Sequence, residues 1–210
     1  MKKKNISVDQ INDPVEHLKK SDPILSSVIE LVDRPVWQPT ADYFRALVED
    51  IINQQLSDKA SATITKRFNT LFPKLPYTSK QVLLLTDASI RRVGISWAKV
   101  SYIKDLAQNV QTGTLDFKNI HKYSDEEVIK HLLQVKGIGR WTAEMFLMFS
   151  LGREDVFSYG DQGLKNAIKH LYKLKKHPTP LLAEKISAKW KPYRSLACRY
   201  LWRSLDLEDV

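Results

Sequence analysis

The most informative segment of this 210-residue sequence is Leu132-Leu-Gln-Val-Lys-Gly-Ile-Gly-Arg-Trp-Thr-Ala143. Its apolar spacing predicts one helix, then a tight turn at Gly137 and Gly139, then a second helix that begins at Arg140. The apolar side chains around the turn can pack the two helices together, and Ala143 allows their close approach. The segment therefore predicts two helices joined by a sharp turn that depends on glycine.

This turn is suited to binding a phosphate group. The backbone N–H groups at the start of the second helix point outward, and the positive end of the helix dipole favours an anion. Lys136 and Arg140 add positive charge on either side of Gly137, Ile138 and Gly139. The spacing matches the helix-hairpin-helix pattern, which holds the DNA backbone without reading its sequence. An ordinary corner between two helices, with glycines needed for geometry alone, is the alternative interpretation.

Most of the chain has the spacing of amphipathic helices. Apolar residues recur every three or four positions, and sustained strand-like alternation is missing. Capping-box patterns begin at Ser7 and Ser124, and Pro180 and Pro192 stand where a first helical turn tolerates proline. We therefore expect an all-α fold, with helices near 9–19, 22–32, 40–54, 57–70, 79–83, 86–92, 96–111, 124–134, 140–150, 161–174, 180–189 and 192–204.

The composition favours a basic globular protein that binds a polyanion. Hydrophobic residues make up 43% of the chain, and Lys plus Arg outnumber Asp plus Glu by 33 to 24, which gives a net charge of +9. Such an excess indicates nucleic acid first and an acidic membrane surface second. Because no apolar run approaches about 18 residues, we expect no membrane span. The polar residues after Met1–Lys4 are not typical of a secretory signal.

Cys198 is the single cysteine, so the chain cannot form an internal disulfide. Its isolation excludes a cysteine-rich zinc site and an iron–sulfur cluster, and a reducing, intracellular setting fits best. The five histidines lack the spacing of metal ligands. We therefore expect neither a metal nor another cofactor.

Glycine is concentrated in one region, because five of the seven glycines lie between residues 137 and 163. The region contains Asp155-Val-Phe-Ser-Tyr-Gly-Asp161, which precedes the helical run Leu164–Leu174. An aspartate here caps the helix, and the backbone donors stabilise its negative charge. A rigidly held carboxylate is also what a developing sugar oxocarbenium ion requires. The sequence alone is compatible with Asp161 as a cap only and with Asp161 as a cap that is also catalytic.

A second loop, Asn53-Gln-Gln-Leu-Ser57, lies between two predicted helices and is rich in side-chain amides. Amides in such a loop can enter a DNA groove or fill the space left by a displaced base. A polar turn with Ser57 as a helix cap explains the same residues equally well. The segment Gly94–Lys99 is interpreted as a structural turn into a helix.

Taken in order, five segments resemble the helix-hairpin-helix DNA glycosylase superfamily: Asn53–Ser57, Gly94–Ser96, Val135–Ala143, Asp155–Asp161 and Trp190–Ala197. Within it, the chain resembles the DNA-3-methyladenine glycosylase II branch over roughly residues 13 to 205. The resemblance implies an all-α fold of two helical lobes, with a helix-hairpin-helix motif and a DNA-binding cleft between the lobes. It implies a single glycosylase unit over 1–210, with a central lobe near 35–150 and a terminal lobe formed by 1–34 and 151–210.

The resemblance also assigns roles to residues. Asp161 matches the catalytic aspartate, and Gln55 matches a residue that relatives push into the duplex. The positions that match the base pocket are Trp141, Met145 and Trp202. The residues expected to contact DNA are Gln54, Gln55, Ser57, Lys136, Gly137, Ile138, Gly139 and Arg140.

The resemblance implies a monofunctional enzyme of base excision repair that flips alkylated purines (3-methyladenine and 7-methylguanine) and hydrolyses their N-glycosidic bond. Bifunctional relatives carry a lysine where this chain has Trp141, so a Schiff-base mechanism is not expected. The sequence reveals no acid partner for Asp161, and a cationic base needs none. A glycosylase for deaminated or oxidised bases and a non-enzymatic DNA-binding module are the alternatives.

The expected partner is double-stranded DNA with alkylated bases, and no membrane contact is expected. We expect a monomer in the cytoplasm, associated with the nucleoid in a prokaryote, or in the nucleus of a eukaryote.

Overall fold

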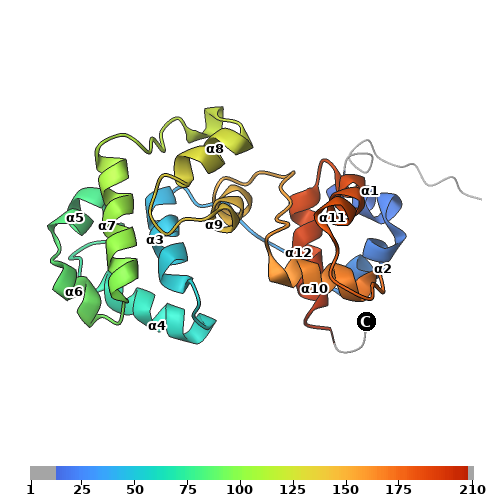
Figure 1. Cartoon of the computed structure of the whole chain (residues 1–210), viewed down its shortest axis with the longest axis horizontal. Coiled ribbons are helices and arrows are strands. Elements are labelled where there is room, and N and C mark those ends of the chain that lie inside the picture. Colours follow the sequence, from blue (N-terminus) through green and yellow to red (C-terminus); the bar gives the residue numbers. More distant parts are fainter. Residues whose placement is uncertain (1–12, 208–210) are drawn as a thin grey trace, which may run out of the picture. The chain divides into compact units, whose positions relative to one another are not determined.

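The computed structural model describes residues 13–207, and all regular structure in that range is helical (Figure 1). The all-α prediction is therefore confirmed. The chain divides into two compact units, Pro39–Gly152 and the combination of Met1–Gln38 with Arg153–Val210. We call them the hairpin unit and the terminal unit. Within the described range, no helix combines the length and the apolar character needed to cross a membrane.

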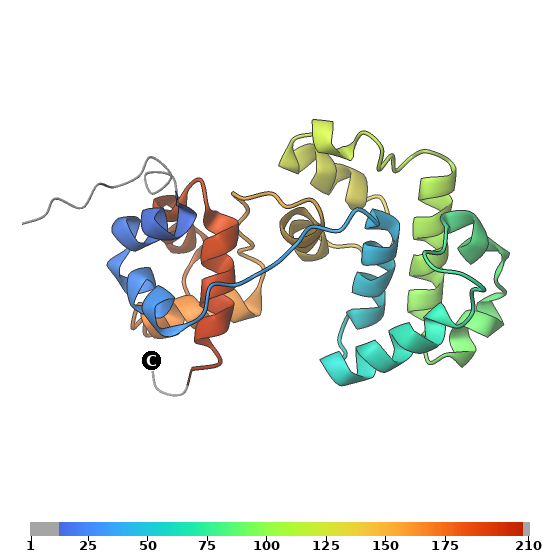
Figure 2. The same ribbon diagram turned by 180° about the vertical axis from the view of Figure 1, so that it is seen from behind.

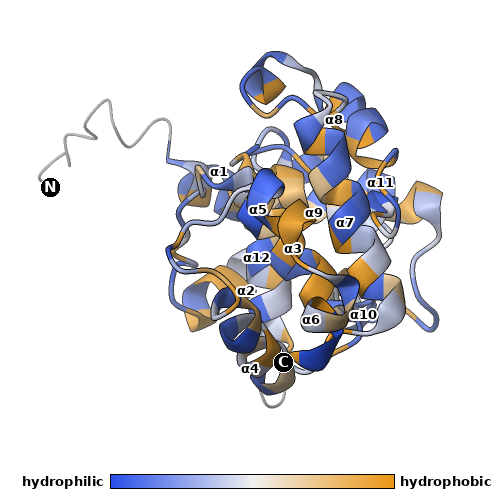
Figure 3. Ribbon diagram, turned by 90° about the vertical axis from the view of Figure 1, so that its left-hand side faces the viewer, coloured by the Kyte–Doolittle hydropathy of each residue, from blue (hydrophilic) through white to orange (hydrophobic). Residues whose placement is uncertain are grey.

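The hairpin unit is built around the packing of α7 against α3 and α5 (Figure 1). The buried side chains of α3 and α7 include Leu47, Ile51, Ile103 and Leu106. Most helices in Figure 3 carry both apolar and polar residues, as expected of amphipathic helices around a core. The elements are α3 (Tyr43–Asn53), α4 (Asp58–Asn69), α5 (Ser79–Leu84), α6 (Asp87–Arg92), α7 (Trp97–Gln111), the 3₁₀ turn η2 (Ile120–Lys122), α8 (Asp125–Leu132), α9 (Arg140–Met145) and the π-helical turn η3 (Phe146–Ser150).

The terminal unit combines helices that are distant in the sequence. α12 packs against both α2 and α10, so helices from the two ends of the described range share one core (Figure 2). Leu18, Leu25, Trp190 and Leu201 are fully buried in this unit. Its elements are α1 (Pro14–Ser21), α2 (Pro23–Leu31), α10 (Gln162–Leu171), α11 (Pro180–Ser187), the 3₁₀ turn η4 (Ala188–Trp190) and α12 (Arg194–Ser204).

Helix starts follow the local signals in the sequence. Ser124 and Glu127 form the predicted capping box of α8, and Pro180 occupies the first turn of α11, as predicted. The capping box predicted at Ser7 lies outside the described residues, and α1 begins at Pro14 behind the cap Asp13. Short-range side-chain signals therefore account for most helix starts.

Several helix bounds differ from the prediction by a few residues, and two of the differences have a clear backbone cause. The helix expected over 192–204 begins at Arg194, because the backbone of Tyr193 is not helical (φ −117°, ψ 35°). The helix expected over 140–150 changes from α to π geometry at Phe146, whose carbonyl accepts from the Leu151 N–H at 3.0 Å. Apolar periodicity cannot distinguish these hydrogen-bonding patterns.

A fully buried carboxylate, Asp22, connects the helices of the terminal unit. Its Oδ1 caps α2 by accepting from the Ile24 N–H at 3.1 Å. Its Oδ2 accepts from the Trp190 indole N–H at 3.0 Å and from the Tyr172 hydroxyl, and the Lys189 ammonium lies 3.9 Å away. One side chain therefore joins α2 to the end of α10 and to η4.

Replacement of this carboxylate should destabilise the terminal unit severely. Asp22→Ala removes a helix cap and leaves the buried donors of Trp190 and Tyr172 without their acceptor. We expect a loss of about 3–5 kcal/mol in the free energy of unfolding, measured by chemical denaturation. Asp13→Ala is the matched control, because Asp13 caps α1 in a less buried position and should cost only about 1 kcal/mol. Equal losses in the two variants would contradict the proposed connecting role.

Candidate functional site

The predicted hairpin is present between α8 and α9. Leu132, Val135 and Ile138 are buried, as their packing role requires. Gly137 has a left-handed backbone conformation (φ +79°), and a Cβ atom there would lie 2.2 Å from the ring of Tyr102. Only glycine fits at this position, since both the backbone angle and the adjacent ring exclude a side chain.

Both cationic side chains of the hairpin are paired with acids. The Lys136 ammonium lies 3.5 Å from Asp105, whose carboxylate also accepts from the Lys136 backbone N–H at 2.9 Å. The Arg140 guanidinium lies 2.5 Å from Glu126 and 3.0 Å from Glu144. The sequence did not indicate these pairs, which fix the two cations in position and reduce the net charge beside the turn.

The loop between α3 and α4 is tied to the hairpin. The side-chain amide of Gln54 donates to the Gly137 carbonyl at 2.9 Å. The ammonium of Lys99 donates to the backbone carbonyls of Ile52 at 2.8 Å and Gln54 at 2.6 Å, where α3 ends. Gln54, predicted to contact DNA, therefore has a positioning role within the protein. Lys99, at the start of α7, was interpreted as structural, and it holds this loop.

The next residues of the loop face solvent. Gln55 is exposed and has a left-handed backbone conformation (φ +56°), which is uncommon for a residue with a side chain. Leu56 is 39% exposed. Ser57 caps α4 by accepting from the Ala60 N–H at 3.4 Å, so the capping interpretation of Ser57 describes the contact that the structure shows.

A pocket of about 670 Å³ lies between this loop and the hairpin, entirely within the hairpin unit. Trp141 is 45% exposed there, so it is not a core residue. Met145, one turn further along the helix, is partly exposed. The residues that line the pocket are Asp50, Asn53, Gln54, Gln55, Leu56, Tyr102, Gly137, Gly139, Trp141, Thr142 and Met145.

One carboxyl group that lines this pocket was not identified from the sequence. Asp50 lies on α3, and its side chain makes no hydrogen bond or ion pair with the described residues. Burial raises the pKa of Asp50 to about 7, with a smaller contribution from the neighbouring charge of Glu49. A carboxyl group of this kind has no distinctive sequence pattern, because its environment is created by tertiary packing.

The predicted catalytic aspartate is held by two donors in the terminal unit. Asp161 caps α10, and its Oδ1 accepts from the Leu164 N–H at 2.7 Å and from the Trp202 indole N–H at 2.9 Å. A Cβ atom on Gly163 would lie 3.1 Å from that oxygen and 3.1 Å from Trp202 Cδ1. The small residue at 163 therefore leaves room for the hydrogen bond between Trp202 and Asp161.

The structure thus gathers the predicted residues into two groups. Trp141 and Met145 lie with the hairpin glycines in one unit, and Trp202 lies with Asp161 in the other. Capping and catalysis by Asp161 are compatible, because the carboxylate that caps α10 is also partly exposed.

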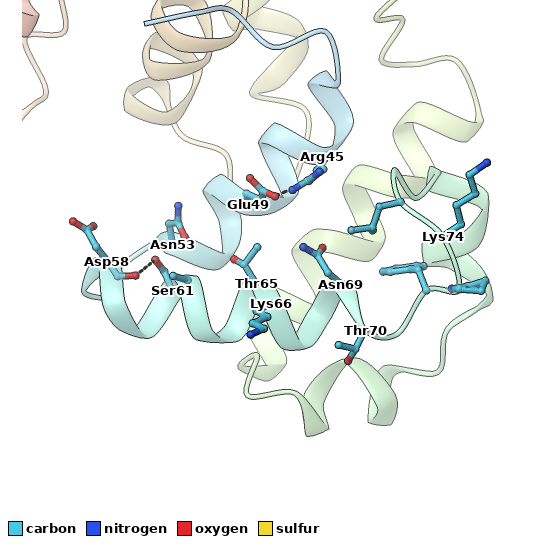
Figure 4. Close-up of a pocket in the computed structure, with 14 residues that line it drawn as sticks. Arg45, Glu49, Asn53, Asp58, Ser61, Thr65, Lys66, Asn69, Thr70 and Lys74 are labelled. Carbon is cyan, nitrogen blue, oxygen red and sulfur yellow. Dashed lines mark hydrogen bonds and ion pairs between the residues drawn. The ribbon is translucent and has the colours of Figure 1, made fainter. Parts of the chain in front are cut away.

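A larger pocket of about 840 Å³ runs along α4 (Figure 4). Of the amide-rich loop that the sequence indicated, it contains Asn53 alone, and it contains neither a hairpin residue nor Asp161. Its charged side chains have both signs and include the Arg45–Glu49 ion pair, with an N–O distance of 2.7 Å, and Lys66. This mixture does not favour a polyanion, so we assign the pocket no part in the candidate site.

The hairpin places the chain in a known class of DNA repair proteins. Residues 48–192 match the family described as HhH-GPD superfamily base excision DNA repair protein. The chain therefore belongs to this family.

Two relatives narrow the class further. DNA-3-methyladenine glycosylase 1 of Schizosaccharomyces pombe is 34% identical over 168 residues, covering 79% of this chain and 74% of that protein. The alkylbase DNA glycosidase-like protein mag2 of the same yeast is 32% identical over 197 residues, covering 90% of this chain and 91% of that protein.

Solved structures agree with these relatives. The S. pombe 3-methyladenine DNA glycosylase Mag1 in complex with abasic DNA has a TM-score of 0.84 at 32% identity, covering 94% of this chain and 98% of that one. A DNA-3-methyladenine glycosidase from Bacillus halodurans has a TM-score of 0.82 at 36% identity, covering 92% and 89% of the two chains. The chain is thus similar to DNA glycosylases named for 3-methyladenine.

The close contact at Gly137 leads to a prediction about the free energy of unfolding. Gly137→Ala combines left-handed backbone strain with a clash against Tyr102, and each should cost about 1–3 kcal/mol. We expect a clear loss in the free energy of unfolding by chemical denaturation. Gly139→Ala is the matched control, because Gly139 has an extended backbone and no atom within 4 Å of an added Cβ.

Adding Tyr102→Ala to Gly137→Ala should relieve the steric part of the loss and leave the backbone part. If Gly137→Ala were as stable as Gly139→Ala, the glycine would not be required at the turn.

Proposed function

We propose that this protein is a monofunctional DNA glycosylase that releases alkylated purines, chiefly 3-methyladenine and 7-methylguanine, from double-stranded DNA. The observation that carries the proposal is the Asp161 carboxylate, held by the Leu164 N–H and the Trp202 indole. The family supports a role in base excision repair, and the names of the relatives support an alkylated base.

DNA binding is assigned to the hairpin and the adjacent loop. The backbone N–H groups after Gly139 are suited to a phosphate oxygen. Gln55, exposed and already in a strained conformation, fills the space that the displaced nucleotide leaves. Gln54 and Lys99 hold the loop at its place beside the hairpin.

Asp161 acts on the sugar. As the bond between C1′ and the base nitrogen breaks, its electron pair leaves with the base and positive charge develops on the sugar. The fixed carboxylate stabilises that charge, and water adds to C1′ and loses a proton. The cap and the indole keep the carboxylate in one orientation, so little reorganisation is needed during the reaction.

The base is chosen by its charge. Alkylation at N3 or N7 makes a purine cationic, so the base leaves without a general acid. A cation also gains about 0.5–2 kcal/mol from an aromatic face. Trp141 is exposed to the pocket, and Trp202 lies beside Asp161, so both rings are placed outside the packed core or at its edge.

The chemistry does not depend on an amine or thiol nucleophile. Trp141 stands where bifunctional relatives carry lysine. Burial raises the pKa of the Cys198 thiol to about 12, so it is not a thiolate at neutral pH. Hydrolysis by water is therefore the reaction that we assign, and we propose that the protein acts as a monomer.

Asp161→Asn tests the catalytic assignment. Asparagine still caps a helix but carries no charge, so excision should fall by about a hundredfold or more. The measurement is incubation with methylated duplex DNA followed by chromatography of the released bases. DNA binding should persist or tighten, because a negative charge near phosphate is removed.

Asp13→Asn is the control, since Asp13 also caps a helix of the terminal unit. It should leave excision close to the wild-type rate. Near-normal release of 3-methyladenine by Asp161→Asn would refute the role of this carboxylate.

Gly139→Asp tests the hairpin as the anchor on the DNA backbone. A Cβ atom added at this position has no atom within 4 Å. A negative charge beside phosphate should weaken binding to every duplex by roughly tenfold, with a strong salt dependence. Gly139→Ala controls for size. A change in base preference without loss of affinity would show that the hairpin does not hold the backbone.

A further inference from the structure

The terminal unit has a cationic surface at the end of α10, made of residues that the proposed reaction does not use. From residue 162 to residue 183 the chain carries five lysines, two histidines and no aspartate or glutamate. Lys169, His170, Lys173 and His177 line a pocket of about 550 Å³ there, and none of its lining residues is acidic. This pocket therefore differs from the pocket along α4, whose charges have both signs.

The lysines of this pocket have no acidic partner among the described residues. Neither Lys169 nor Lys173 makes an ion pair there, whereas Lys19 in the same unit lies 3.8 Å from Glu30. A lysine in the last turn of a helix complements the negative end of the helix dipole, which accounts for Lys169. The dipole does not account for Lys173, because this residue lies beyond the end of α10.

Lys173 has a backbone conformation that favours glycine. It is left-handed (φ +52°), and the N–H of the next residue, Leu174, donates to the Lys169 carbonyl at 2.9 Å. Glycine usually occupies this position where a helix ends, because a side chain is strained there. The fold thus keeps a lysine that lowers stability, at a point where its side chain lines a pocket. Strain that a fold retains in this way is typical of functional positions.

Apolar side chains accompany these cations. Three leucines line the pocket: Leu174, Leu205 and Leu207. His170 and Lys173 also line a second pocket, of about 540 Å³, together with Ile24 of α2, which is 36% exposed. We call these two pockets, which share His170 and Lys173 and lie entirely within the terminal unit, the α10 groove.

The chemistry of the α10 groove favours an acidic peptide over DNA. Its cations attract either kind of polyanion. The leucines and the isoleucine, however, gain nothing from a hydrated phosphate backbone. Neither pocket is lined by a Trp, Tyr or Phe side chain on which an unpaired base could stack. A peptide supplies both carboxylates for the lysines and apolar side chains for the two pockets.

We propose that the α10 groove binds an acidic segment of a partner protein, with an apolar side chain in each pocket and a carboxylate on Lys173. None of the residues of the groove belongs to the site assigned to base release. The contact therefore joins the protein to a partner and leaves the chemistry at Asp161 unchanged.

The test measures binding of a labelled synthetic peptide to the full chain by fluorescence anisotropy. In this peptide, two glutamates lie between two leucines. We expect saturable binding that weakens about tenfold when the salt concentration rises from about 0.05 to about 0.5 M, because salt screens exposed charges. A peptide with glutamines in place of the glutamates, and one with serines in place of the leucines, should each bind about tenfold more weakly.

Lys173→Gly separates binding from stability. It removes a cation and relieves the backbone strain, so peptide affinity should fall about tenfold while the midpoint of chemical denaturation rises. Lys169→Ala should also weaken peptide binding. Lys185→Ala is its matched control, as an exposed helical lysine outside both pockets, and should bind the peptide like the wild type. All three variants should release methylated bases at the wild-type rate.

The absence of saturable peptide binding would overturn the inference, and so would unchanged affinity in both Lys169→Ala and Lys173→Gly. If these two variants instead weaken binding to duplex DNA and leave peptide binding unchanged, the groove contacts DNA and the inference is wrong. An equal loss of peptide affinity in Lys185→Ala would also overturn it, since the attraction would then come from net charge alone.

Discussion

The ring of Tyr102 occupies the space in which a side chain at position 137 would lie, only 2.2 Å from where its Cβ would be. The left-handed backbone of Gly137 makes the turn between α8 and α9, and its carbonyl accepts the amide of Gln54. Because residue 137 has no side chain, the hairpin can approach both α7 and the loop before α4. Tyr102, Gly137 and Gln54 all line the pocket, so its shape depends on that close approach.

The same arrangement of hydrogen bonds occurs twice in the terminal unit. Asp22 and Asp161 each cap a helix, and each accepts from a tryptophan indole, at 3.0 Å from Trp190 and 2.9 Å from Trp202. Asp22 is fully buried and accepts from a further donor, which suits a residue that holds helices together. Asp161 is partly exposed, which suits contact with a substrate. Burial, rather than the local hydrogen bonds, separates the structural from the proposed chemical role.

Asp161 and Asp50 lie in different environments although they are the same residue type. A backbone N–H and an indole N–H hold the Asp161 carboxylate, whereas burial raises the pKa of Asp50 to about 7.

Local sequence signals determined most of the secondary structure. The capping box at Ser124, the glycines of the hairpin and the cap Asp161 act over four residues or fewer, so the sequence shows them directly. The resemblance of ordered motifs indicated the family, which the comparisons then established. The roles of individual residues remain proposals.

Tertiary structure alone decided the contacts between distant residues. The amide of Gln54 meets a carbonyl 83 positions away, the Lys99 ammonium meets one 45 positions away, and Trp202 meets Asp161 across 41 positions. The unpaired burial of Asp50 also arises only when α3, α7 and α9 enclose one pocket. The spacing of apolar residues and the capping residues show where a helix lies and where it ends. The burial of a side chain and the positions of its hydrogen-bond donors depend instead on which distant residues pack against that helix.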